Sequence, residues 1–405
     1  MARLAVLSYH TSPLAQPGTG DSGGMNVYVR ELSAALARQG HDVDIYTRRD
    51  APELRDVVRV EPGLRVHHVT AGPSAPLGRA QMAHYVDDFA DALKAIMRSS
   101  GLPDALHANY WLSGVAGHRL KHELGLPLIM TFHTLERVKA ATFESESEER
   151  AEQEAALFAC ADAALASCEV EADQFVRLYG ASASRVFVVP LGVEHAFFAP
   201  GRRAQARRAL GAHDEVPLLL FVGRLQALKG VDLALETLIE LREREVAAQL
   251  AIVGGPSGPD GRDTLSALHR RVREAGVIES VNFVAPQAHQ LLSTWMRAAD
   301  VTLVPSRAES FGLVALESSA CGTPVVASDV GGLPTLVDDD VNGVLMGTRD
   351  PSAWADAVQH VLEPATAARL GAGGVQRARA YTWAAAATSL GRLVCTFADS
   401  STVRC

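Results

Sequence analysis

The sequence predicts an α/β protein built from two doubly wound parallel-sheet domains. Short apolar runs such as Leu4–Leu7 and Leu218–Val222 alternate with stretches of helical periodicity, a pattern typical of a parallel sheet covered by helices. The alternation restarts after a polar segment that carries Pro200-Gly201. The chain has 405 residues, which is too long for one hydrophobic core and suits two domains.

We expect the first domain to span residues 1–196 and the second residues 197–382, followed by a helical segment over 383–405. The strands expected in the first domain are Leu4–Leu7, Val43–Tyr46, Val66–Val69, Ala105–His107, Leu126–Thr131, Ala163–Ala166 and Val186–Val189. The helices expected there include Asn26–Gln39 and Gln81–Arg98. The second domain is expected to contain strands at Leu218–Val222, Val281–Val284 and Val301–Val304. In such open sheets ligands bind beyond the carboxyl ends of the strands, so residues that follow strands are the candidates for a site.

The composition of the chain excludes several classes of protein. Hydrophobic residues make up 48% and charged residues 21%, which is ordinary for a globular enzyme. A net charge of −9 argues against nucleic acid or an anionic membrane surface as the main partner. The five cysteines form no C-x-x-C pair, which suits reduced thiols and neither a disulfide framework nor a zinc site. No apolar run is long enough for a signal peptide or a membrane span, so we expect a cytoplasmic protein.

Two carboxylates stand eight residues apart around a predicted strand-to-helix turn. Glu309 lies in the loop after Val301–Val304, and Glu317 lies about two turns into the following helix. They can therefore address opposite ends of one extended ligand, such as a hexose and a ribose. The alternative is an exposed loop Glu and a helix Glu paired with an Arg. Backbone N–H groups at the helix start can meet a phosphate, and the residues there are Phe311, Gly312 and Leu313.

Two cations follow the strand Leu218–Val222. Arg224 can hold two phosphate oxygens at once, and Lys229 adds a point charge for a third. A diphosphate needs counter-charge of this kind. Taken alone, the same pair could be a solvated basic loop.

The loop between Tyr9 and Val29 is longer than a usual connection and rich in glycine. Gly23 and Gly24 lack a Cβ, so their backbone can approach a diphosphate or sugar at the start of the next helix. A flexible turn is the alternative interpretation of this Gly-Gly pair.

Together these motifs resemble the retaining GT-B glycosyltransferases, and the match covers nearly the whole chain. The segments that carry the resemblance are Gly223-Arg224-Leu225 with Lys229-Gly230, Ile252-Val253-Gly254-Gly255, Pro305-Ser306 with Glu309 and Glu317, and Gly331-Gly332-Leu333-Pro334. The resemblance implies that Arg224 and Lys229 hold the donor diphosphate, that Glu309 meets the transferred sugar and that Glu317 meets the ribose. It also implies that the last helix packs back on the first domain.

The N-terminal loop is similar to that of the mycothiol-pathway branch, whose enzymes join N-acetylglucosamine to inositol phosphate. The resemblance then implies acceptor contacts from residues with polar or cationic side chains, here Asn26, Arg79, Tyr110, Thr134 and Arg150. An inositol phosphate needs such groups for its phosphate and its ring of hydroxyls. For Trp111, beside Tyr110, we favour a place in the core.

Three departures from that branch keep the acceptor open, one of which is Gly230 after Lys229, the general form of the family. Arg79 stands where a Lys is expected, and Arg150 lies one position closer to the following Glu-Gln than expected. The Arg150 spacing resembles the sucrose-phosphate-synthase-like branch. Another acceptor, a mannosyl donor, a GT-B sugar-nucleotide epimerase and a binding protein without activity therefore remain as alternatives.

The resemblance also implies a mechanism. His133, at the carboxyl end of Leu126–Thr131, is expected to stabilise the transition state through its backbone carbonyl or imidazole, and it joins Glu309, Arg224 and Lys229 as the catalytic set. The family's displacement occurs on the front face of the sugar, with the leaving diphosphate accepting the proton. UDP is the expected carrier, and its base is expected to meet backbone groups near Val284. We expect no cofactor and no required metal, a nucleotide-sugar donor and a small phosphorylated acceptor as partners, and we leave a homodimer open.

Overall fold

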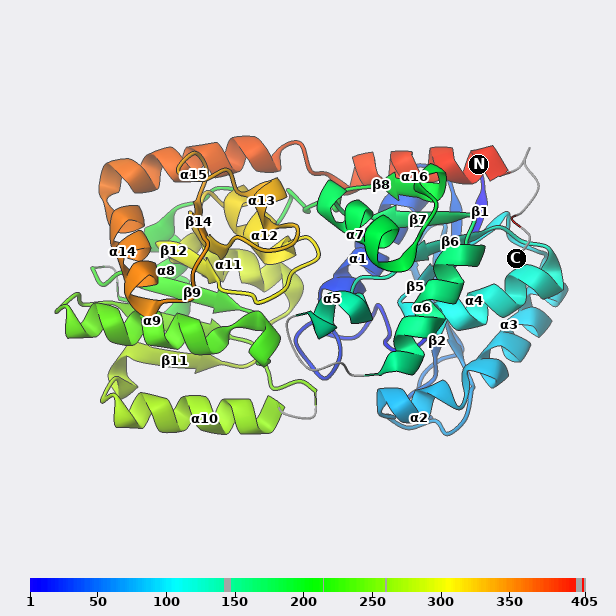
Figure 1. The fold of residues 1–405 in the computed structure, drawn as a ribbon, viewed down its shortest axis with the longest axis horizontal. Helices are drawn as coiled ribbons and strands as arrows, with labels where there is room; N and C mark the ends of the chain where they lie inside the picture. Colours follow the sequence, from blue (N-terminus) through cyan, green and yellow to red (C-terminus); the bar gives the residue numbers. More distant parts are fainter. Residues whose placement is uncertain (142–146, 214, 259–260, 398–402, 404–405) are drawn as a thin grey trace. The chain divides into compact units, whose positions relative to one another are not determined.

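The chain forms two units, each with its own parallel sheet (Figure 1). This computed structural model describes all residues except 142–146, 214, 259–260, 398–402 and 404–405. Unit 1 comprises Met1–Ala15, Met25–Gly192 and Trp383–Cys405, and unit 2 comprises Gln16–Gly24 and Val193–Thr382. The division falls at residues 192 and 193, where the sequence suggested 196 and 197, and residues 16–24 group with unit 2 although the sequence placed them in the first domain.

Unit 1 contains an eight-stranded sheet in the order β3-β4-β2-β1-β5-β6-β7-β8. Its strands are β1 (Arg3–Leu7), β2 (Asp42–Arg48), β3 (Val57–Glu61), β4 (Leu64–Val69), β5 (Ala105–Asn109), β6 (Leu128–Thr131), β7 (Ala163–Ala166) and β8 (Val186–Val188). All neighbours are parallel except β3 and β4. The strand β3 was not expected from the sequence. It is an edge strand with no buried residue, so it lacks the continuous apolar run of the buried strands.

The helices of this half of the chain are α1 (Gly24–Arg38), α2 (Arg79–Ala83), α3 (Val86–Ser100), α4 (Trp111–Leu124), α5 (Glu136–Ala140), α6 (Glu148–Cys160) and α7 (Glu169–Tyr179). The single helix expected over 81–98 is two helices, separated at His84 and Tyr85. The break places the Tyr85 ring directly against Gly72, where a Cβ would lie only 2.6 Å from the ring. Such a tertiary contact leaves no local signal in the sequence.

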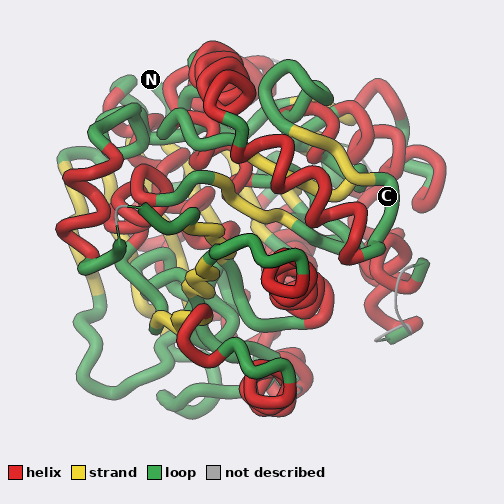
Figure 2. Tube along the Cα trace, turned by 90° about the vertical axis from the view of Figure 1, so that its left-hand side faces the viewer, coloured by secondary structure: helices red, strands yellow, loops and turns green. Residues whose placement is uncertain are grey.

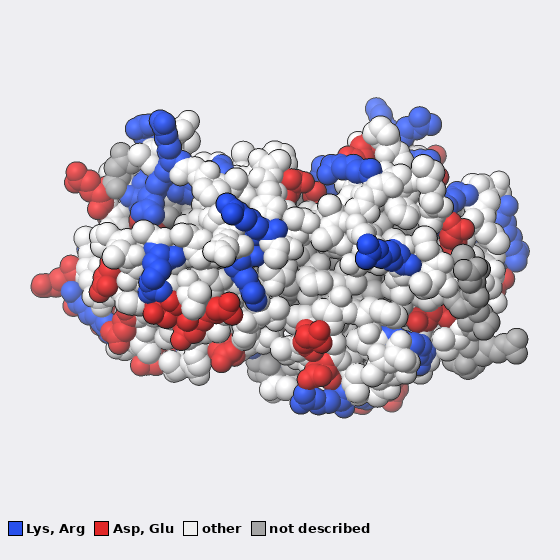
Figure 3. All heavy atoms as spheres, turned by 90° about the horizontal axis from the view of Figure 1, so that it is seen from above, with Lys and Arg blue, Asp and Glu red and all other residues white. Residues whose placement is uncertain are grey.

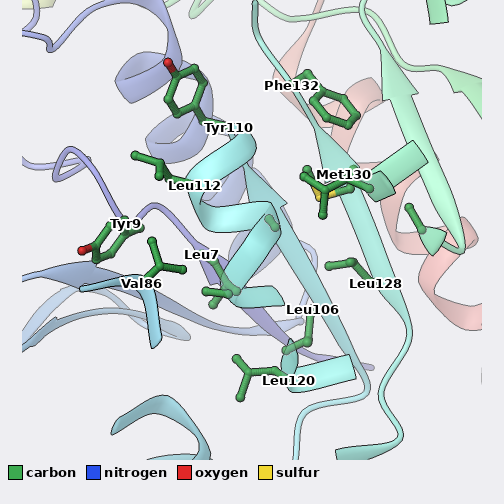
Figure 4. Packing of buried hydrophobic residues seen from close by; sticks show 14 of the residues in the cluster. Leu7, Tyr9, Val86, Leu106, Tyr110, Leu112, Leu120, Leu128, Met130 and Phe132 are labelled. Carbon is green, nitrogen blue, oxygen red and sulfur yellow. The ribbon is translucent and has the colours of Figure 1, made fainter. Parts of the chain in front are cut away.

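The core of unit 1 lies between the sheet and the helices α3, α4, α6 and α7. Figure 4 shows its centre, where Leu7, Leu106 and Leu128 from adjacent strands pack against Leu112 and Leu120 of α4. These side chains are almost fully buried, and each contributes about 1.5–3 kcal/mol of burial free energy. The core therefore fixes the carboxyl ends of β5 and β6, where the candidate acceptor residues follow.

Unit 2 repeats the pattern with six parallel strands in the order β11-β10-β9-β12-β13-β14. Its strands are β9 (Leu218–Val222), β10 (Gln249–Val253), β11 (Val281–Val284), β12 (Val301–Val304), β13 (Val325–Ser328) and β14 (Val344–Met346). Its helices are α8 (Arg203–Leu210), α9 (Val231–Glu243), α10 (Gly261–Glu274), α11 (Leu292–Ala298), α12 (Leu313–Ala320), α13 (Leu333–Leu336), α14 (Pro351–Leu362) and α15 (Pro364–Ala378). In Figure 2 the yellow strands lie between red helices, as expected for doubly wound sheets. The predicted α/β class with two parallel sheets is confirmed.

The last helix, α16 (Trp383–Phe397), belongs to unit 1. Gln39, just after α1, donates from Nε2 to the Ala384 carbonyl at 2.8 Å, and the Trp383 ring meets Tyr28 of α1 edge-on at 6.1 Å. A Cβ at Gly391 would lie 2.9 Å from the His41 ring, so α16 passes close to the turn after α1. The helix α16 thus packs against α1 and the turn that follows it.

On the face shown in Figure 3, basic and acidic side chains both occur among uncharged residues and lie next to one another in places. Among the helices that the structure describes, none has the length and apolarity needed to cross a bilayer.

Candidate active site

Three loops of unit 2 leave the carboxyl edge of its sheet side by side, because β9 pairs with β12 and β12 pairs with β13. The loops are residues 223–230, 305–312 and 329–332. They contain the basic motif, the first carboxylate and the Gly-Gly-Leu-Pro motif. The Arg307 N–H donates to the Leu228 carbonyl at 2.8 Å, and the Gly332 N–H donates to the Glu309 carbonyl at 3.0 Å. The fold therefore brings together motifs that are up to 100 or so residues apart in the chain.

Two glycines allow these loops to touch. Gly230 has a φ of +70°, and a Cβ there would lie 1.9 Å from the Pro305 carbonyl oxygen. Gly331 has a φ of +54°, and its Cβ would lie 1.8 Å from the Glu309 carbonyl oxygen. Both positions combine a left-handed backbone with contact against another loop, which only glycine accommodates. These glycines fix the loops on either side of Glu309.

Lys229 and Glu309 form an ion pair within this loop cluster. Lys229 ends the 3₁₀ turn η2 (Ala227–Lys229), and its Nζ lies 2.7 Å from Glu309 Oε2. The side chains of Lys229 and Glu309 are 25% and 17% exposed, so the pair is accessible to a ligand while partly shielded from solvent. Ser306 also donates from Oγ to Glu309 Oε2 at 3.3 Å. The two residues predicted for diphosphate and sugar are therefore neighbours.

Arg224 is half-buried in the first of these loops. Gly23 lies against it, and a Cβ there would meet Arg224 Nε at 3.4 Å. Gly24 begins α1 and has open space where its Cβ would stand. The Gly-Gly pair and the predicted diphosphate arginine are thus adjacent, as the sequence hypothesis requires.

The start of α12 provides the predicted backbone donors. Gly312 precedes the helix with a φ of +105°, and Leu313 is its first residue. Phe311 is buried and meets Tyr381 edge-on at 5.9 Å, so its side chain anchors the turn. The first N–H groups of a helix have no partner within it and carry a partial positive charge. This geometry suits an anionic ligand at the loop edge.

Glu317 lies in the second turn of α12, where its side chain is 3% exposed. His289 donates from Nε2 to Glu317 Oε1 at 2.5 Å and belongs to the 3₁₀ turn η4 (His289–Leu291). The sequence analysis did not single out His289. It lies 28 residues before Glu317, and only the packing of η4 and α11 near α12 brings the two together.

The segment after β11 is the predicted contact for the base. The Val284 carbonyl accepts from the Gly254 N–H at 3.0 Å, and the Pro286 carbonyl accepts from Gln16 Nε2 at 2.7 Å. Each carbonyl oxygen has a second lone pair, so both can still accept from a ligand. Gln16 belongs to the loop of unit 2 that also carries Gly23.

In unit 1, two candidate acceptor-side residues adopt a left-handed backbone. Tyr110 follows β5 with a φ of +75°, and His133 follows β6 with a φ of +63°. Each position costs a non-glycine residue about 1–3 kcal/mol, and such strain concentrates at functional sites. The Tyr110 ring lies 4.3 Å from the His10 ring, centroid to centroid. The strain supports a functional role for the ends of β5 and β6.

The His133 imidazole is held as a neutral ring. Its Nε2 lies 2.9 Å from Asn109 Oδ1, and because an amide oxygen only accepts, Nε2 donates this hydrogen bond. The Tyr28 ring packs edge-on at 4.9 Å. Burial is the main cause that lowers the pKa of His133 to about 3, and the neighbouring His107 and His10 lower it further by smaller amounts. A ring with this pKa is a weak base at neutral pH, which agrees with a hydrogen-bonding role and not proton abstraction.

Arg150 lies inside unit 1, with a side chain that is 4% exposed. Its Nε donates to Glu154 at 2.8 Å, and its terminal nitrogens lie 3.2 Å from Glu136 Oε2 and 2.9 Å from the Thr134 carbonyl. Its guanidinium also lies 5.0 Å from the centroid of the Tyr110 ring. This geometry favours a structural role, in which Arg150 donates to the Thr134 carbonyl and packs against the Tyr110 ring. The direct phosphate contact that we expected for Arg150 gains no support from this arrangement.

The remaining acceptor candidates differ in burial. Asn26 is 2% exposed and donates from Nδ2 to Thr11 Oγ1 at 2.9 Å and to the Ser12 carbonyl at 2.7 Å, so it braces the N-terminal loop. Thr134 is half-buried and also accepts from Arg150 at its Oγ1. Arg79 begins α2 and is partly exposed. Of the two arginines, Arg79 is the better placed for a charged ligand.

One group among the described residues has the composition of a metal site. His118 and His122 of α4 lie within 4.8 Å of the Cys160 sulfur, at the end of α6 opposite Arg150. Cys160 is bonded in a disulfide, so it offers no thiolate ligand there. The expectation of reduced thiols holds for Cys168, Cys321 and Cys395 and is wrong for Cys160. Cys405 lies outside the described residues.

Comparisons with known proteins place this geometry among sugar-transferring enzymes. Residues 202–376 match the family model described as glycosyl transferases group 1, and residues 23–192 match the glycosyl transferase 4-like domain. The chain is 44% identical to a D-inositol 3-phosphate glycosyltransferase from Actinosynnema mirum, over 95% of this chain and 94% of the relative. It is 45% identical to the protein of that name from Xylanimonas cellulosilytica, over 96% and 95%.

Solved structures show the same fold. Sucrose-phosphate synthase from Thermosynechococcus elongatus superposes with a TM-score of 0.91 at 35% identity, covering 99% of this chain and all of the other. Anabaena HepE, solved with UDP and glucose, gives a TM-score of 0.79 at 19% identity, covering 98% and 100%. At that identity the second likeness shows the fold alone.

Proposed function

Because the chain belongs to the group 1 glycosyltransferases and is therefore a hexosyl-transferring enzyme of GT-B fold, we propose that it moves N-acetylglucosamine from a UDP-sugar to 1D-myo-inositol 3-phosphate with retention at the anomeric carbon. The observation that carries the acceptor half is the identity of 44% over almost the whole length with relatives named for inositol 3-phosphate. The donor half rests on the meeting of Lys229, Glu309 and the α12 start in one loop cluster.

In the proposed donor site, charge on the diphosphate is balanced by Arg224, Lys229 and the first N–H groups of α12. Arg224 and Lys229 offer up to two positive charges against the diphosphate, and the helix start adds a favourable partial charge. The backbone of Gly23 and Gly24 is assigned to the same diphosphate, the segment at Val284 to the base, and Glu317 to the ribose. These groups are sufficient to stabilise the leaving diphosphate by electrostatics and positioning.

In the proposed acceptor site, Arg79 and the hydroxyls of Tyr110 and Thr134 contact an inositol phosphate. A phosphate ester carries about two negative charges near neutral pH, so a cation and hydroxyl donors are the chemistry it needs. Arg150 is assigned here to holding Thr134 and Tyr110 in place, because its guanidinium is engaged with Glu136 and Glu154. Asn26 likewise holds the loop that leads to Gly23.

The proposed chemistry needs no protein base. The acceptor hydroxyl oxygen bonds to the anomeric carbon on the face from which UDP departs, the bond from that carbon to the β-phosphate oxygen breaks, and the hydroxyl proton passes to the departing phosphate. Glu309 binds the transferred sugar, and the neutral His133 donates or accepts hydrogen bonds near the developing positive charge. A cytoplasmic location stays a prediction, and a homodimer stays open.

A phosphorylated hexose such as fructose 6-phosphate is the second candidate acceptor. The likeness to a sucrose-phosphate synthase, at 35% identity and a TM-score of 0.91, favours it together with the Arg150 spacing. The same cationic groups would receive either phosphate. Choice of acceptor therefore depends on the hydroxyl pattern of the ring, which the chain's charges do not distinguish.

The test is a panel of UDP- and GDP-sugars offered with inositol 3-phosphate, inositol or fructose 6-phosphate, with products identified by mass. We expect product from UDP-N-acetylglucosamine with inositol 3-phosphate and very little with unphosphorylated inositol. Product only with fructose 6-phosphate would select the second candidate. Conversion of the donor sugar without any acceptor would instead indicate an epimerase.

A further inference from the structure

The contact between His289 and Glu317 adds a residue to the nucleotide site. Glu317 is the carboxylate assigned to the ribose, and its side chain is 3% exposed, whereas that of His289 is 17% exposed. His289 donates from Nε2 to Glu317 Oε1 at 2.5 Å. A carboxylate buried to this extent needs a hydrogen-bond partner to remain charged and fixed. Within the described residues, His289 is the side chain found to supply one.

We propose that His289 is a positioning residue for the donor's ribose, acting through Glu317. This inference rests on the proposed function, since it takes the ligand to be a nucleoside diphosphate sugar. With Oε1 held by His289, the carboxylate cannot rotate freely, and Oε2 presents its lone pairs to the ribose hydroxyls. A group held in place before binding loses less conformational entropy when the ligand arrives.

The position of His289 in the chain couples the ribose to the base. It lies five residues after Val284, at the start of η4, so one short segment carries both the backbone assigned to the base and the imidazole that holds Glu317. Phe198, which is fully buried, packs against the imidazole at 5.0 Å between centroids and limits its movement. Base and ribose are directly bonded in a nucleotide, so their two contacts must keep a fixed spacing. A segment that carries both provides it.

If His289 has this role, replacing it should weaken only the part of the nucleotide affinity that comes from the ribose hydroxyls. We would measure binding of UDP and of 2′,3′-dideoxy-UDP by calorimetry to the parent, His289→Leu and His289→Gln. The parent should bind UDP more tightly than the dideoxy nucleotide. His289→Leu should weaken UDP about tenfold, the scale of one charge-assisted hydrogen bond, and leave dideoxy-UDP nearly unchanged. Glutamine can donate from a similar position, so His289→Gln should recover most of the loss.

A matched control is available in the same unit. His360 also pairs with a carboxylate, lying 3.2 Å from Asp340 at the surface of α14, where its side chain is 46% exposed. His360→Leu should bind both nucleotides like the parent. Thermal unfolding of every variant, followed by circular dichroism, checks that the fold is retained.

Kinetics and a double variant give independent readouts. His289→Leu should raise the KM for the UDP-sugar with little change in kcat, and Glu317→Gln should weaken UDP by itself. Because His289 acts through Glu317, adding His289→Leu to Glu317→Gln should cost little more than Glu317→Gln alone.

Four outcomes would overturn the inference. Equal losses for UDP and dideoxy-UDP in His289→Leu, or no loss for either, would remove His289 from ribose binding. Unfolding of both His289 variants would make the residue structural. If the parent itself bound dideoxy-UDP as tightly as UDP, the ribose assignment of Glu317 in the proposed function would fail, and the inference with it.

Discussion

Lys229 stands between two anionic partners, the carboxylate that it contacts and the diphosphate proposed for it. The ion pair with Glu309 keeps the ammonium at the loop edge and neutralises part of its charge. A diphosphate must therefore compete with Glu309 for Lys229. The balance between the two should appear in the affinity for UDP.

We predict opposite effects from the two members of this pair. Lys229→Ala should weaken UDP about 10- to 100-fold, because it removes a charge-assisted contact of roughly 1.5–3 kcal/mol, and Arg224→Ala should act likewise. Glu309→Gln should bind UDP at least as tightly as the parent and yet turn over slowly, since the sugar loses its carboxylate. Calorimetry with UDP and steady-state kinetics separate these effects. Lys94→Ala, which breaks a surface pair with Glu123, is the control. Weaker UDP binding by Glu309→Gln would contradict the competition.

The neutral histidines of unit 1 predict a pH dependence of stability. Burial lowers the pKa of His107 to about 3, as it does for His133. The ordinary value is near 6.5, so between about pH 6.5 and 3 the unfolded chain binds more protons than the folded one, and the free energy of unfolding falls as the pH falls. Above about pH 7 the two rings add no pH dependence.

Thermal melts between pH 7.5 and pH 5 should record this fall. Each ring contributes up to about 1.4 kcal/mol per pH unit within the window. His107→Gln keeps a hydrogen-bond donor for Thr131, to which His107 now bonds at 2.8 Å, and should give a shallower slope. Parallel slopes for the variant and the parent would show that His107 is not held neutral.

The two arginines assigned near the acceptor should behave differently. Arg150→Ala leaves Glu136 and Glu154 buried without their cation, so we expect a loss of about 3–5 kcal/mol in the free energy of unfolding. Arg79→Ala should leave the unfolding free energy nearly unchanged and reduce the preference for a phosphorylated acceptor. Urea unfolding and acceptor competition measure the two effects. A stable Arg150→Ala protein that lost only its phosphate preference would restore the direct contact first expected of Arg150.

At the scale of elements, the loop cluster of unit 2 depends on glycine contacts. Gly230→Ala would place a Cβ 1.9 Å from the Pro305 carbonyl oxygen and impose a left-handed backbone on alanine. We expect a loss of more than about 1 kcal/mol in stability and weaker UDP binding, because the loop that carries Lys229 must shift. Gly347→Ala has open space around its Cβ and serves as the control. Equal melting temperatures and UDP affinities for the two variants would contradict this account.

The sequence could predict most of these elements because the information is local. The buried parallel strand β9 is an uninterrupted apolar run and β12 is interrupted only by Thr302, and the predicted bounds of both strands agree with the structure. The motifs after those strands were recognisable from residue type and spacing. By contrast, β3 is an edge strand with no buried residue, and the break between α2 and α3 lies where Tyr85 contacts Gly72. Neither leaves a periodic signal.

The candidate site, like the fold, could be predicted from the sequence only in part. Lys229 and Glu309 could be proposed from their motifs, whereas His289 could not, because its role comes from a contact across 28 residues and not from its neighbours. The resemblance implied a phosphate contact for Arg150, and only the structure shows that two buried glutamates already surround it. Residue type predicts what a side chain can do. Burial and partners determine which of those uses is open to it.

At the scale of the whole molecule, each unit has a separate core, and the final helix contributes to the first. Leu390 of α16 and Leu370 of α15 are both fully buried, and they lie 20 residues apart in different units. Truncating either to alanine should cost about 2–5 kcal/mol. We expect Leu390→Ala to speed hydrogen exchange in β1 and β5 and Leu370→Ala to speed it in β9 and β12. Mass-resolved exchange measures both. Faster exchange of β9 in Leu390→Ala alone would contradict the assignment of α16 to unit 1.

The return of α16 to unit 1 also bears on how the protein is made. A ribosome releases the chain from its N-terminus, and domains usually fold in that order. Here unit 1 also needs Trp383 and Leu390, which are buried in it, so this last layer is synthesised only after the whole of unit 2. Unit 2 is complete at residue 382 and can fold before unit 1 closes. Until α16 is synthesised, the surface of unit 1 that α16 covers stays exposed to solvent. We therefore expect chaperones to bind the nascent chain at this surface.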